Sequence, residues 1–294
     1  MNVQIIILDH NSFMDINTIC ICGAGTMGSG IAQVSATAGF HTILYEVNNE
    51  VLQKAKTIID SGLQILVEKN KLTHQKKQEA ISRILFTNDL QLCIADVFIE
   101  AIVERADYKI ALFNQLAELN HSETIFASNT SSLSISSIAE KVNNPQRVAG
   151  LHFFNPAPVM KLVEVVKGKQ TDAAVMNRLI QLTKELGKTA VVCKDSPGFI
   201  VNRVARPFYI ESLRLAEDGI SNFEVIDRLL ESRGFKLGPF KLMDLIGNDI
   251  NYTVSYSLYE QLEQPERLRP SRIQKEKLDN GELGRKTKKG YYKY

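Results

Sequence analysis

A glycine-rich turn between an apolar run and a helical stretch restricts the fold of this chain more than any other feature. Residues 23–30 have the sequence GAGTMGSG, directly after the apolar run 18–22 and before a stretch at 31–38 that is typical of a helix. In this setting the spacing G-x-G-x-x-G joins free backbone N–H groups with the positive end of a helix dipole, and such a turn binds a pyrophosphate. The sequence therefore predicts a βαβ unit that holds a dinucleotide.

Each glycine of the turn has its own geometric purpose. Gly23 allows the tight turn, Gly25 lets a pyrophosphate approach the backbone, and Gly28 permits close packing of helix on strand. Thr26 and Met27 lie between the last two of these glycines. We expect all five residues to contact a bound cofactor.

The second strand predicts which dinucleotide is bound. The run 42–46 ends in Glu46, at the distance from the turn where an acidic residue holds the ribose hydroxyls. A carboxylate there repels a 2′-phosphate, and residues 47–49 contain no arginine that could receive one, so NAD is favoured over NADP. FAD is the main alternative for such a fold, but no further flavin-type motif accompanies the turn.

Short β-rich runs alternate with helical stretches between residues 17 and 193, which indicates βαβ units. The expected fold class is α/β: a Rossmann-type, mostly parallel sheet with helices on both faces, followed by an all-α C-terminal domain. The last three runs are joined by short links, so we expect some of them to be antiparallel. The expected strands are 18–22, 42–46, 97–101, 125–128, 148–153, 162–166 and 190–193.

The pattern also predicts domain boundaries. Residues 1–14 are interpreted as an N-terminal extension, and residues 15–196 as the dinucleotide-binding domain, with a helical-pair insertion near 51–85 formed by helices at 51–69 and 75–85. Pro197 and Gly198 mark a change to a helical pattern. Residues 197–294 are therefore expected to form an all-α domain for dimerisation and substrate binding. Its expected helices are 199–217, 222–232, 239–260 and 272–280.

Composition argues against several classes of protein. The 294 residues include 35 basic and 33 acidic side chains, so whole-chain charge does not indicate a nucleic-acid partner. No apolar run has the length of a membrane span, so no membrane partner is expected. The four cysteines have no paired or framework spacing, and no residue cluster has the spacing of metal ligands. We expect a reducing, cytoplasmic location and no metal.

A histidine and a glutamate on either side of a proline-bounded turn are the strongest candidates for chemistry. His152 and Glu164 lie twelve positions apart in apolar surroundings. If the turn is centred near Pro158, antiparallel pairing places them directly opposite one another. Histidine accepts a proton near neutral pH, and a buried carboxylate fixes its tautomer. Taken alone, the pair is equally well explained as a core histidine beside a chance carboxylate.

Other polar residues also lie at expected strand or helix ends. Ser131 follows the run 125–128, at the sheet edge where open α/β folds bind ligands, but its segment also suits a solvated turn or helix cap. Glu104 has a similar edge position and could equally be an exposed loop acid. Asn202 begins the helical region, where an ordinary polar helix position is the alternative.

At this point several motifs resemble the L-3-hydroxyacyl-CoA dehydrogenases, and most closely their 3-hydroxybutyryl-CoA dehydrogenase type. The resemblance covers residues 17–294 in the right order, and the histidine motif and the KDSPGF motif are highly specific. The matching segments are GAGTMGSG at 23–30, NTSSL at 129–133, GLHFFNP at 150–156, KDSPGFIVNR at 194–203, GPF at 238–240 with Asp244, and GRKT at 284–287.

The resemblance implies roles for individual residues. His152 matches the catalytic base and Glu164 the acid that pairs with it. Ser131 and Asn202 match residues that hold the substrate's 3-oxygen, and Asn155 a neighbour of the serine and the histidine. Glu46 stands where many relatives have aspartate, Lys69 loosely matches a lysine that meets coenzyme A, and Glu104 is taken as a cofactor contact. Lys288 departs from the family, which usually has glycine there.

The expected activity is reversible NAD-dependent oxidation of a short-chain L-3-hydroxyacyl-CoA to the 3-ketoacyl-CoA by a homodimer. Two alternatives remain open. One is a dehydrogenase of the same fold that acts on a non-CoA hydroxy acid of the sugar-acid type. The other is a non-catalytic NAD-binding or structural protein, although the set His152, Glu164, Ser131 and Asn202 argues against it.

Overall fold

The computed structural model describes residues 15–294, and the expected extension at 1–14 lies outside the described residues. The chain divides into two compact units, one up to Asp195 and the other Ser196–Tyr294. The division is one residue before the expected boundary. Each unit is described by itself.

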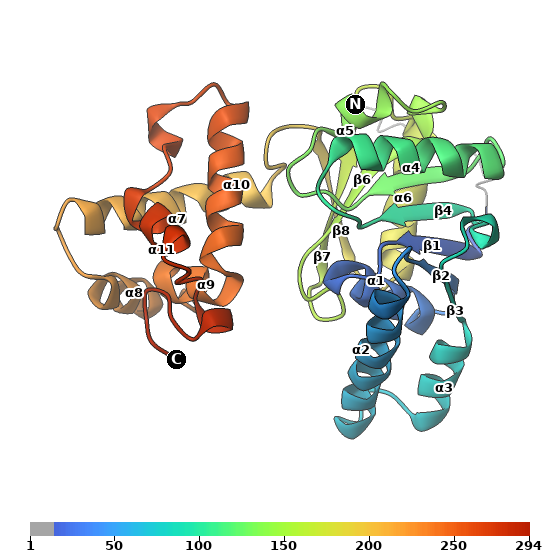
Figure 1. Ribbon diagram of the computed structural model, residues 1–294, viewed down its shortest axis with the longest axis horizontal. Helices are drawn as coiled ribbons and strands as arrows, with labels where there is room; N and C mark the ends of the chain where they lie inside the picture. Colours follow the sequence, from blue (N-terminus) through green and yellow to red (C-terminus); the bar gives the residue numbers. More distant parts are fainter. Residues whose placement is uncertain (1–14) are drawn as a thin grey trace, which may run out of the picture. The chain divides into compact units, whose positions relative to one another are not determined.

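The first unit is built around an eight-stranded sheet with the order β3-β2-β1-β4-β5-β6-β7-β8. Neighbouring strands are parallel except β6 and β7, which are antiparallel, as expected for part of the last group. The α/β fold class is therefore confirmed (Figure 1). The strands are β1 (Thr18–Cys22), β2 (His41–Tyr45), β3 (Ile84–Thr87), β4 (Val97–Glu100), β5 (Ile125–Ser128), β6 (Val148–Phe153), β7 (Leu162–Lys167) and β8 (Thr189–Lys194).

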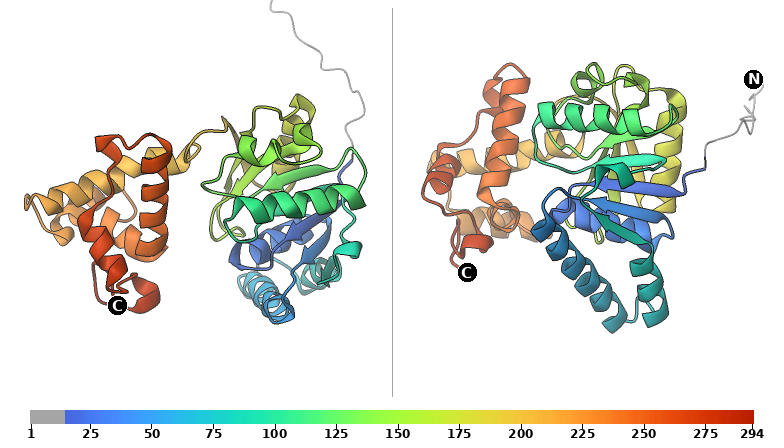
Figure 2. Two further views of the ribbon diagram at one scale, coloured as in Figure 1. Left: turned by 45° about the horizontal axis from the view of Figure 1, so that its top comes forward. Right: turned by 45° about the vertical axis from the view of Figure 1, so that its right-hand side comes forward.

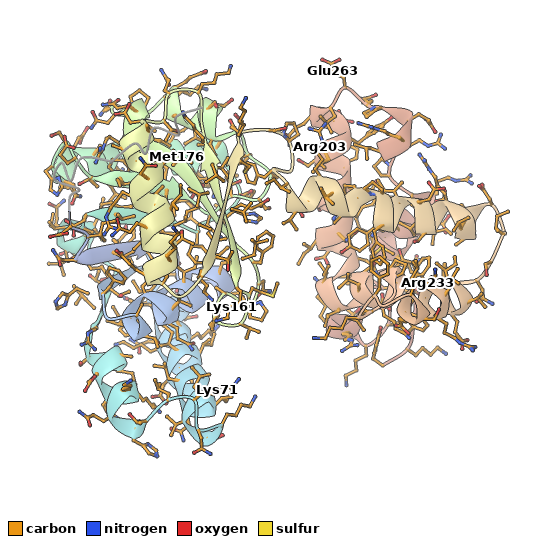
Figure 3. The ribbon with its side chains drawn as sticks, turned by 180° about the vertical axis from the view of Figure 1, so that it is seen from behind. Lys71, Lys161, Met176, Arg203, Arg233 and Glu263 are labelled. Carbon is orange, nitrogen blue, oxygen red and sulfur yellow. The ribbon has the colours of Figure 1, made fainter. Side chains whose placement is uncertain are left out.

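Helices cover both faces of this sheet. Successive side chains of a strand point to opposite faces, so the apolar strands expose apolar side chains on each face that helices must cover. One face carries Ile99, Ala127 and Leu151, which belong to a core shared with α1 (Thr26–Thr37), α2 (Asn49–Glu68) and α6 (Ala173–Glu185). Figure 3 shows α6, with Met176, across this face. The opposite face carries Phe98 and Phe126, which contact each other, and Phe126 also contacts Phe113 of α4 (Ala106–Leu119). The short helix α5 (Ile135–Ala139) lies over Gly150 on that second face.

The helical pair differs from the expectation at its end. The helix α2 is followed by α3 (His74–Ser82), and the two run side by side away from the sheet (Figure 2). The expected helix 75–85 is wrong in its last residues, because Ile84 and Leu85 begin the strand β3, which pairs in parallel with β2. The run ILFT is short and apolar, and periodicity alone does not distinguish such a run from the end of a helix.

The second unit is all-α, as predicted, and is built from five helices in its described residues: α7 (Val201–Glu217), α8 (Phe223–Ser232), α9 (Pro239–Ile246), α10 (Asn248–Gln261) and α11 (Arg272–Asp279). Its core contains Leu213, Ile226, Phe240 and Met243. The single helix expected at 239–260 is wrong. Gly247 has a φ of 106°, which a helix does not tolerate, and it separates α9 from α10.

The end of the chain folds back onto α9. The buried carboxylate of Asp244 accepts hydrogen bonds from the backbone N–H groups of Tyr291 and Tyr292, at 3.0 Å each. Lys288, in the turn before them, has left-handed backbone with a φ of 59°. A glycine would occupy this conformation without steric cost, so the lysine introduces local strain. Among residues 15–294, no helix is long and apolar enough to cross a membrane.

Candidate active site

The glycine turn has the close contacts that its spacing predicts. Gly23 has a φ of 100°, and a Cβ built on it would lie 2.7 Å from the carbonyl oxygen of Ala101, after β4. A Cβ on Gly28 would lie 1.7 Å from the carbonyl oxygen of Gly23, so only glycine lets α1 pack this closely on the turn. A Cβ on Gly25, in contrast, would meet nothing within 4 Å. The turn is therefore tightly packed at Gly23 and Gly28 and open at Gly25. This open side fits the approach of a pyrophosphate.

The first turn of α1 offers the donors that such a group needs. Gly25 is the N-cap and forms no side-chain cap, and the helix begins at Thr26. The first N–H groups of a helix have no partner within it. Thr26 is exposed and Met27 is half-buried, so both lie where a cofactor bound at the turn would contact them.

Glu46 reaches the glycine turn from the end of β2. Its Oε2 accepts a hydrogen bond from the Ala24 N–H at 3.0 Å, and its Oε1 accepts one from the Asn48 N–H at 3.1 Å. These two bonds hold the carboxylate of Glu46 beside the turn, in the position expected of a ribose-binding acid.

The antiparallel pairing expected for His152 and Glu164 is present. The two residues face each other in the register of β6 and β7, and His152 Nδ1 lies 2.8 Å from Glu164 Oε2. His152 is 6% exposed and Glu164 is fully buried. An ionised carboxylate can only accept at this contact, so the proton of a neutral imidazole is placed on Nδ1 and the lone pair on Nε2. This contact holds the imidazole ring of His152 beside a buried carboxylate.

The loop after β5 lies beside the end of β6. The side-chain oxygen of Asn129 accepts a hydrogen bond from the Phe153 N–H at 2.8 Å, next to His152 in the chain. Ser131, two residues further on, donates its N–H to Glu104 Oε1 at 3.2 Å. The structure thus brings the segment that carries Ser131 to the carboxyl edge of the sheet, where His152 also lies.

Glu104 is held by the Ser131 loop and is not a loop acid free of contacts. Its Oε1 also accepts hydrogen bonds from the hydroxyls of Thr130 and Ser132, and its Oε2 lies 3.2 Å from Lys109 Nζ. Burial alone would raise the pKa of Glu104, but Lys109 and the hydroxyl donors outweigh it and leave the pKa lowered. Glu104 therefore stays ionised at neutral pH.

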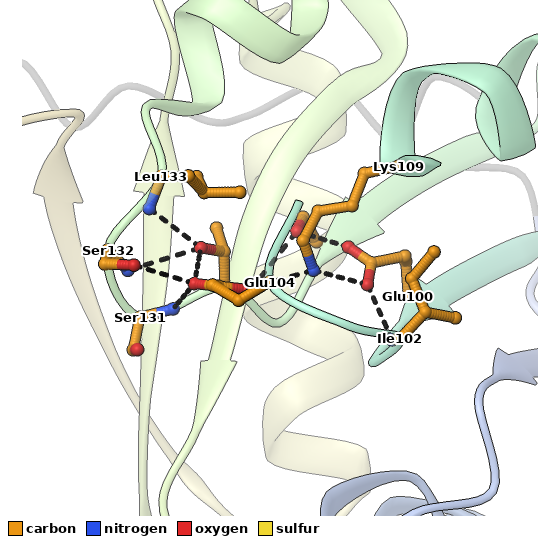
Figure 4. A network of polar contacts seen from close by, with 9 residues as sticks. Glu100, Ile102, Glu104, Lys109, Ser131, Ser132 and Leu133 are labelled. Atoms are coloured by element: carbon orange, nitrogen blue, oxygen red, sulfur yellow. Dashed lines mark hydrogen bonds and ion pairs between the residues drawn. The ribbon is translucent and has the colours of Figure 1, made fainter. Parts of the chain in front are cut away.

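Sequence reasoning missed the two buried charges behind Glu104. Glu100, the last residue of β4, lies 2.6 Å from Lys109 Nζ on α4, and both side chains are at most 1% exposed (Figure 4). Burial raises the pKa of Glu100, against the opposing effects of Lys109, Ser128 and the Ile102 N–H. One signal was available in the sequence, namely an acid within the buried run VFIE, since a buried carboxylate requires a partner.

For three expected site residues, no described contact joins them to the His152–Glu164 pair. Asn202 lies in the first turn of α7, in the second unit. Asn155 is exposed after β6. Lys69 is exposed at the C-cap of α2, where its backbone N–H completes the helix. No group of three or more metal-ligating side chains is found in the described part of the chain.

The fold and this edge of the sheet define the class of NAD-binding Rossmann proteins. The sequence models of the two 3-hydroxyacyl-CoA dehydrogenase domains match the chain in order: the NAD binding domain over residues 18–196 and the C-terminal domain over residues 198–294. The chain therefore belongs to the 3-hydroxyacyl-CoA dehydrogenase family.

Similar proteins include two that are named as CoA-dependent dehydrogenases. A 3-hydroxyadipyl-CoA dehydrogenase of Escherichia coli is 46% identical over 95% of this chain, and a mitochondrial hydroxyacyl-coenzyme A dehydrogenase of Sus scrofa is 38% identical over 95% of this chain and 91% of its own length. This chain spans 59% of the length of that E. coli relative.

Solved structures give the same result. A 3-hydroxybutyryl-CoA dehydrogenase of E. coli superposes with a TM-score of 0.93 at 45% identity, over 95% of this chain and 60% of its own. An (S)-3-hydroxybutyryl-CoA dehydrogenase of Ralstonia eutropha superposes with a TM-score of 0.91 at 36% identity. The superposition covers 95% of this chain and 99% of that chain.

Proposed function

We propose that the chain catalyses the reversible oxidation of an L-3-hydroxyacyl-CoA to the 3-ketoacyl-CoA, with NAD as the hydride acceptor. The observation that carries the proposal is the buried His152–Glu164 pair at the same sheet edge as the glycine turn. A hydroxyl group is oxidised by loss of a proton and a hydride, and the protein must supply the acceptor of the proton.

His152 is the proton acceptor in this proposal. With its Nδ1 proton held by Glu164, its Nε2 lone pair takes the proton of the 3-hydroxyl group as the C3 hydride leaves. Glu164 then stabilises the imidazolium, and the water-poor surroundings of a fully buried carboxylate strengthen that attraction. In the reverse direction the imidazolium returns the proton to the 3-oxygen.

Ser131 and Asn202 are proposed to hold the substrate's 3-oxygen. The Ser131 backbone is tied to Glu104, and its hydroxyl makes no hydrogen bond within residues 15–294, so it is available to a ligand. Asn202 belongs to the first turn of α7 in the second unit. Asn155 is proposed to support this group from the end of β6, and Lys69 to meet the coenzyme A moiety.

The residues of the glycine turn fit an NAD pyrophosphate, and NAD when bound there supplies the hydride acceptor. Gly23, Gly25, Thr26, Met27 and Gly28 would hold the pyrophosphate. Glu46 would bind the ribose hydroxyls and repel a 2′-phosphate. The carboxylate of Glu104 accepts hydrogen bonds from the Ser131 loop. We propose that this carboxylate also contacts the cofactor.

For the acyl group, we propose a short chain such as the 3-hydroxybutyryl group. The names of the two superposed structures support this choice, whereas the E. coli relative at 46% identity is named for a hydroxyadipyl substrate. Kinetics with four-carbon, medium-chain and dicarboxylic 3-ketoacyl-CoA substrates would decide between them. A highest kcat/KM for the dicarboxylic substrate would overturn the short-chain proposal.

The experiment that tests the activity uses the full chain with acetoacetyl-CoA and NADH. We expect His152→Gln to bind NADH with nearly unchanged affinity and to lose turnover by at least about 100-fold, because it lacks the proton donor and acceptor. NADH oxidation and a fluorescence titration measure the two quantities. Retained turnover in His152→Gln would contradict the assignment, as would a wild-type preference for a sugar-acid substrate.

We further propose a homodimer in a reducing, cytoplasmic compartment. All four cysteines are free thiols, which suits such a compartment. The second unit exposes large apolar side chains, including Val204, Ile220 and Leu229 at 72%, 70% and 61% exposure, and a subunit contact that covers them would remove apolar surface from water.

A further inference from the structure

Lys188 is a buried cation that the proposed reaction does not use. It lies between α6 and β8 and is 9% exposed. Among residues 15–294 it forms no ion pair with an acid, and burial, together with the nearby Lys161, lowers its pKa. A buried charge without an opposite charge costs free energy, so the stability of the fold alone does not explain this ammonium group.

The ammonium group of Lys188 holds the segment 154–161, which joins β6 to β7 and is called the β6–β7 turn below. Its Nζ donates hydrogen bonds to the carbonyl oxygens of Ala157 and Met160, at 2.5 and 2.8 Å. One cation therefore fixes two points of the turn backbone.

The backbone around Lys188 gives this contact a fixed base. The Lys188 N–H donates to the carbonyl oxygen of Thr183, near the end of α6, at 3.0 Å. The N–H of Thr189, the first residue of β8, donates to the carbonyl oxygen of Lys161 at 2.8 Å, and Figure 3 labels Lys161. The helix and the sheet together therefore set the position from which the side chain reaches the turn.

The β6–β7 turn also contacts α1, the helix that begins at the glycine turn. A Cβ built on Gly30 would lie 3.2 Å from the Cβ of Ala157 and 3.1 Å from the Cδ of Pro158. These distances are shorter than ordinary van der Waals contact, so the turn packs directly on the helix. Lys188 and Gly30 together therefore determine where the β6–β7 turn lies against α1.

The first residue of the β6–β7 turn reaches His152. The ring of Phe154 packs against the imidazole ring, with 4.6 Å between the ring centroids. Asn155, the next residue, is proposed above to support the groups that hold the 3-oxygen. A displacement of the turn would therefore shift both residues relative to His152, and would shift His152 relative to α1.

We propose that Lys188 is a positioning residue: it holds the β6–β7 turn against α1 and thereby fixes His152 relative to the bound cofactor. The inference rests on the proposed function, in which His152 takes the proton while NAD takes the hydride. The hydrogen bonds of Lys188 reach neither the His152–Glu164 pair nor the glycine turn. A displacement of about 1 Å in a positioning group can lower turnover about 100-fold.

Steady-state kinetics of Lys188→Met with acetoacetyl-CoA and NADH test the inference. We expect kcat to fall by about 10- to 100-fold and both KM values to change by less than about 3-fold, because the binding groups remain and only their alignment is lost. NADH with deuterium at C4 of the nicotinamide gives a second readout. The isotope effect on kcat should be at least as large as in the wild type, since misalignment slows the hydride step. An unchanged kcat or a smaller isotope effect would overturn the inference.

Arg147→Met is the matched control. Arg147 is also 9% exposed, lies directly before β6 and donates to a backbone carbonyl, that of Thr124, at 3.4 Å. We expect its loss to lower the free energy of unfolding in chemical denaturation but to leave kcat of the folded protein unchanged. Equal losses of kcat in Arg147→Met and Lys188→Met would show that any buried cation beside β6 has this effect, and would overturn the inference.

Gly30→Ala displaces the same turn without removing a charge, so it decides the matter if Lys188→Met folds poorly. The added Cβ pushes Ala157 and Pro158 away by a few tenths of an ångström. We expect kcat to fall by about 3- to 10-fold with an unchanged KM for NADH. An unchanged kcat in Gly30→Ala would show that the position of the β6–β7 turn on α1 does not affect the reaction, and the inference would be wrong.

Amide hydrogen exchange provides a readout that does not depend on turnover. In Lys188→Met we expect the peptide covering residues 154–161 to exchange at least about 10-fold faster than in the wild type, with no change in Arg147→Met. Equal exchange in the wild type and Lys188→Met would overturn the inference. If the wild-type protein does not reduce acetoacetyl-CoA, the proposed function fails, and the exchange data alone then decide whether Lys188 holds the turn.

Discussion

We propose that the carboxylate of Glu46 is a single-residue determinant of cofactor choice. Backbone N–H groups of Ala24 and Asn48 hold its two oxygens beside the glycine turn. A 2′-phosphate bound there would lie against an immobilised negative charge, and a like-charge contact of this kind costs several kcal/mol. A preference for NAD over NADP is therefore proposed to depend on this side chain.

We predict that Glu46→Gln lowers the ratio of kcat/KM for NADH to that for NADPH by about 10- to 100-fold, because the repulsion disappears while the size of the side chain stays the same. Steady-state kinetics with both cofactors measure the ratio. Glu50→Gln, four residues further along on the exposed start of α2, is the control and should leave the ratio unchanged. An unchanged ratio in Glu46→Gln would show that another group excludes the phosphate.

At the residue scale, the sequence predicted those contacts of the site that are formed by residues on either side of a short turn. The turn between His152 and Glu164 is short and proline-bounded, so antiparallel pairing leaves one register that places the two side chains together. The Glu100–Lys109–Glu104 bridge was not predictable, because its members come from a strand, a helix and the connection between them. Only the packing of α4 on the sheet brings the ammonium group to both carboxylates.

Among the secondary-structure elements, the turn before the C-terminus contains a residue that does not suit its backbone. Lys288 has a φ of 59°. We predict that Lys288→Gly raises the free energy of unfolding by about 0.5–1 kcal/mol, since a left-handed non-glycine residue costs about 1–2 kcal/mol and the added chain entropy of glycine offsets part of it. Chemical denaturation measures the change.

Lys288→Ala is the control for this prediction. It removes the charge but keeps a Cβ in the left-handed conformation, so we expect no gain in stability. Equal stabilisation by alanine and glycine would mean that the charge of Lys288, and not its backbone, is the unfavourable feature.

The start of α11 depends on a carboxylate from α7. Glu217 accepts hydrogen bonds from the Ser271 hydroxyl and from the N–H groups of Arg272 and Ile273. Burial alone would raise the pKa of Glu217, but these donors outweigh it and the pKa is lowered. An acid with a lowered folded-state pKa stabilises the protein above its unfolded pKa, about 4.3 for glutamate, and this contribution is lost as the pH falls toward the folded value.

We therefore predict that Glu217→Gln destabilises the protein at pH 7 and that the difference from wild type shrinks as the pH falls below about 4.3. Denaturation followed by far-ultraviolet circular dichroism between pH 3 and pH 7 measures both. A constant difference across this range would show that the hydrogen bonds, and not the charge of Glu217, stabilise α11.

Elements with clear end signals were predicted more reliably than those without. Strands β1, β5 and β6 begin and end where the sequence predicts, since each is an apolar run bounded by turn residues. The sequence pattern did not predict the strand β3, because its four residues continue the apolar pattern of α3. The break at Gly247 was missed because one glycine in a helical pattern is often tolerated, and its positive φ becomes necessary only once α9 and α10 pack in different directions.

For the whole molecule, the apolar surface of the helical unit has the clearest consequence. We predict that the wild-type protein sediments as a dimer and that Leu229→Glu weakens dimerisation by at least about 10-fold, because a charge would be buried in an apolar contact. Sedimentation velocity over a range of concentrations measures this. Ile94→Glu, at a similarly exposed apolar residue of the other unit, should have no effect. A wild-type monomer, or equal effects of both substitutions, would contradict the prediction.

The general architecture followed from the sequence because alternating runs allow few arrangements. Parallel strands need helical crossovers, and the glycine turn identifies the first of them. The strand order was not predicted, because β3 at one edge of the sheet was missed, and the exact division at Asp195 depends on packing.

The reversed direction of β7 has a consequence for how a histidine and a carboxylate come to face each other at the ligand edge of a sheet. In a wholly parallel sheet every strand presents its last residues at the ligand edge, and its first residues belong to the opposite, structural edge. Because β7 runs against β6, Glu164, the third residue of its strand, lies beside His152 near the end of the neighbouring strand. A single change of strand direction thus makes a position near the start of a strand available for chemistry. In related sheets, the search for a partner of a catalytic histidine should therefore include the first residues of any strand that runs in reverse.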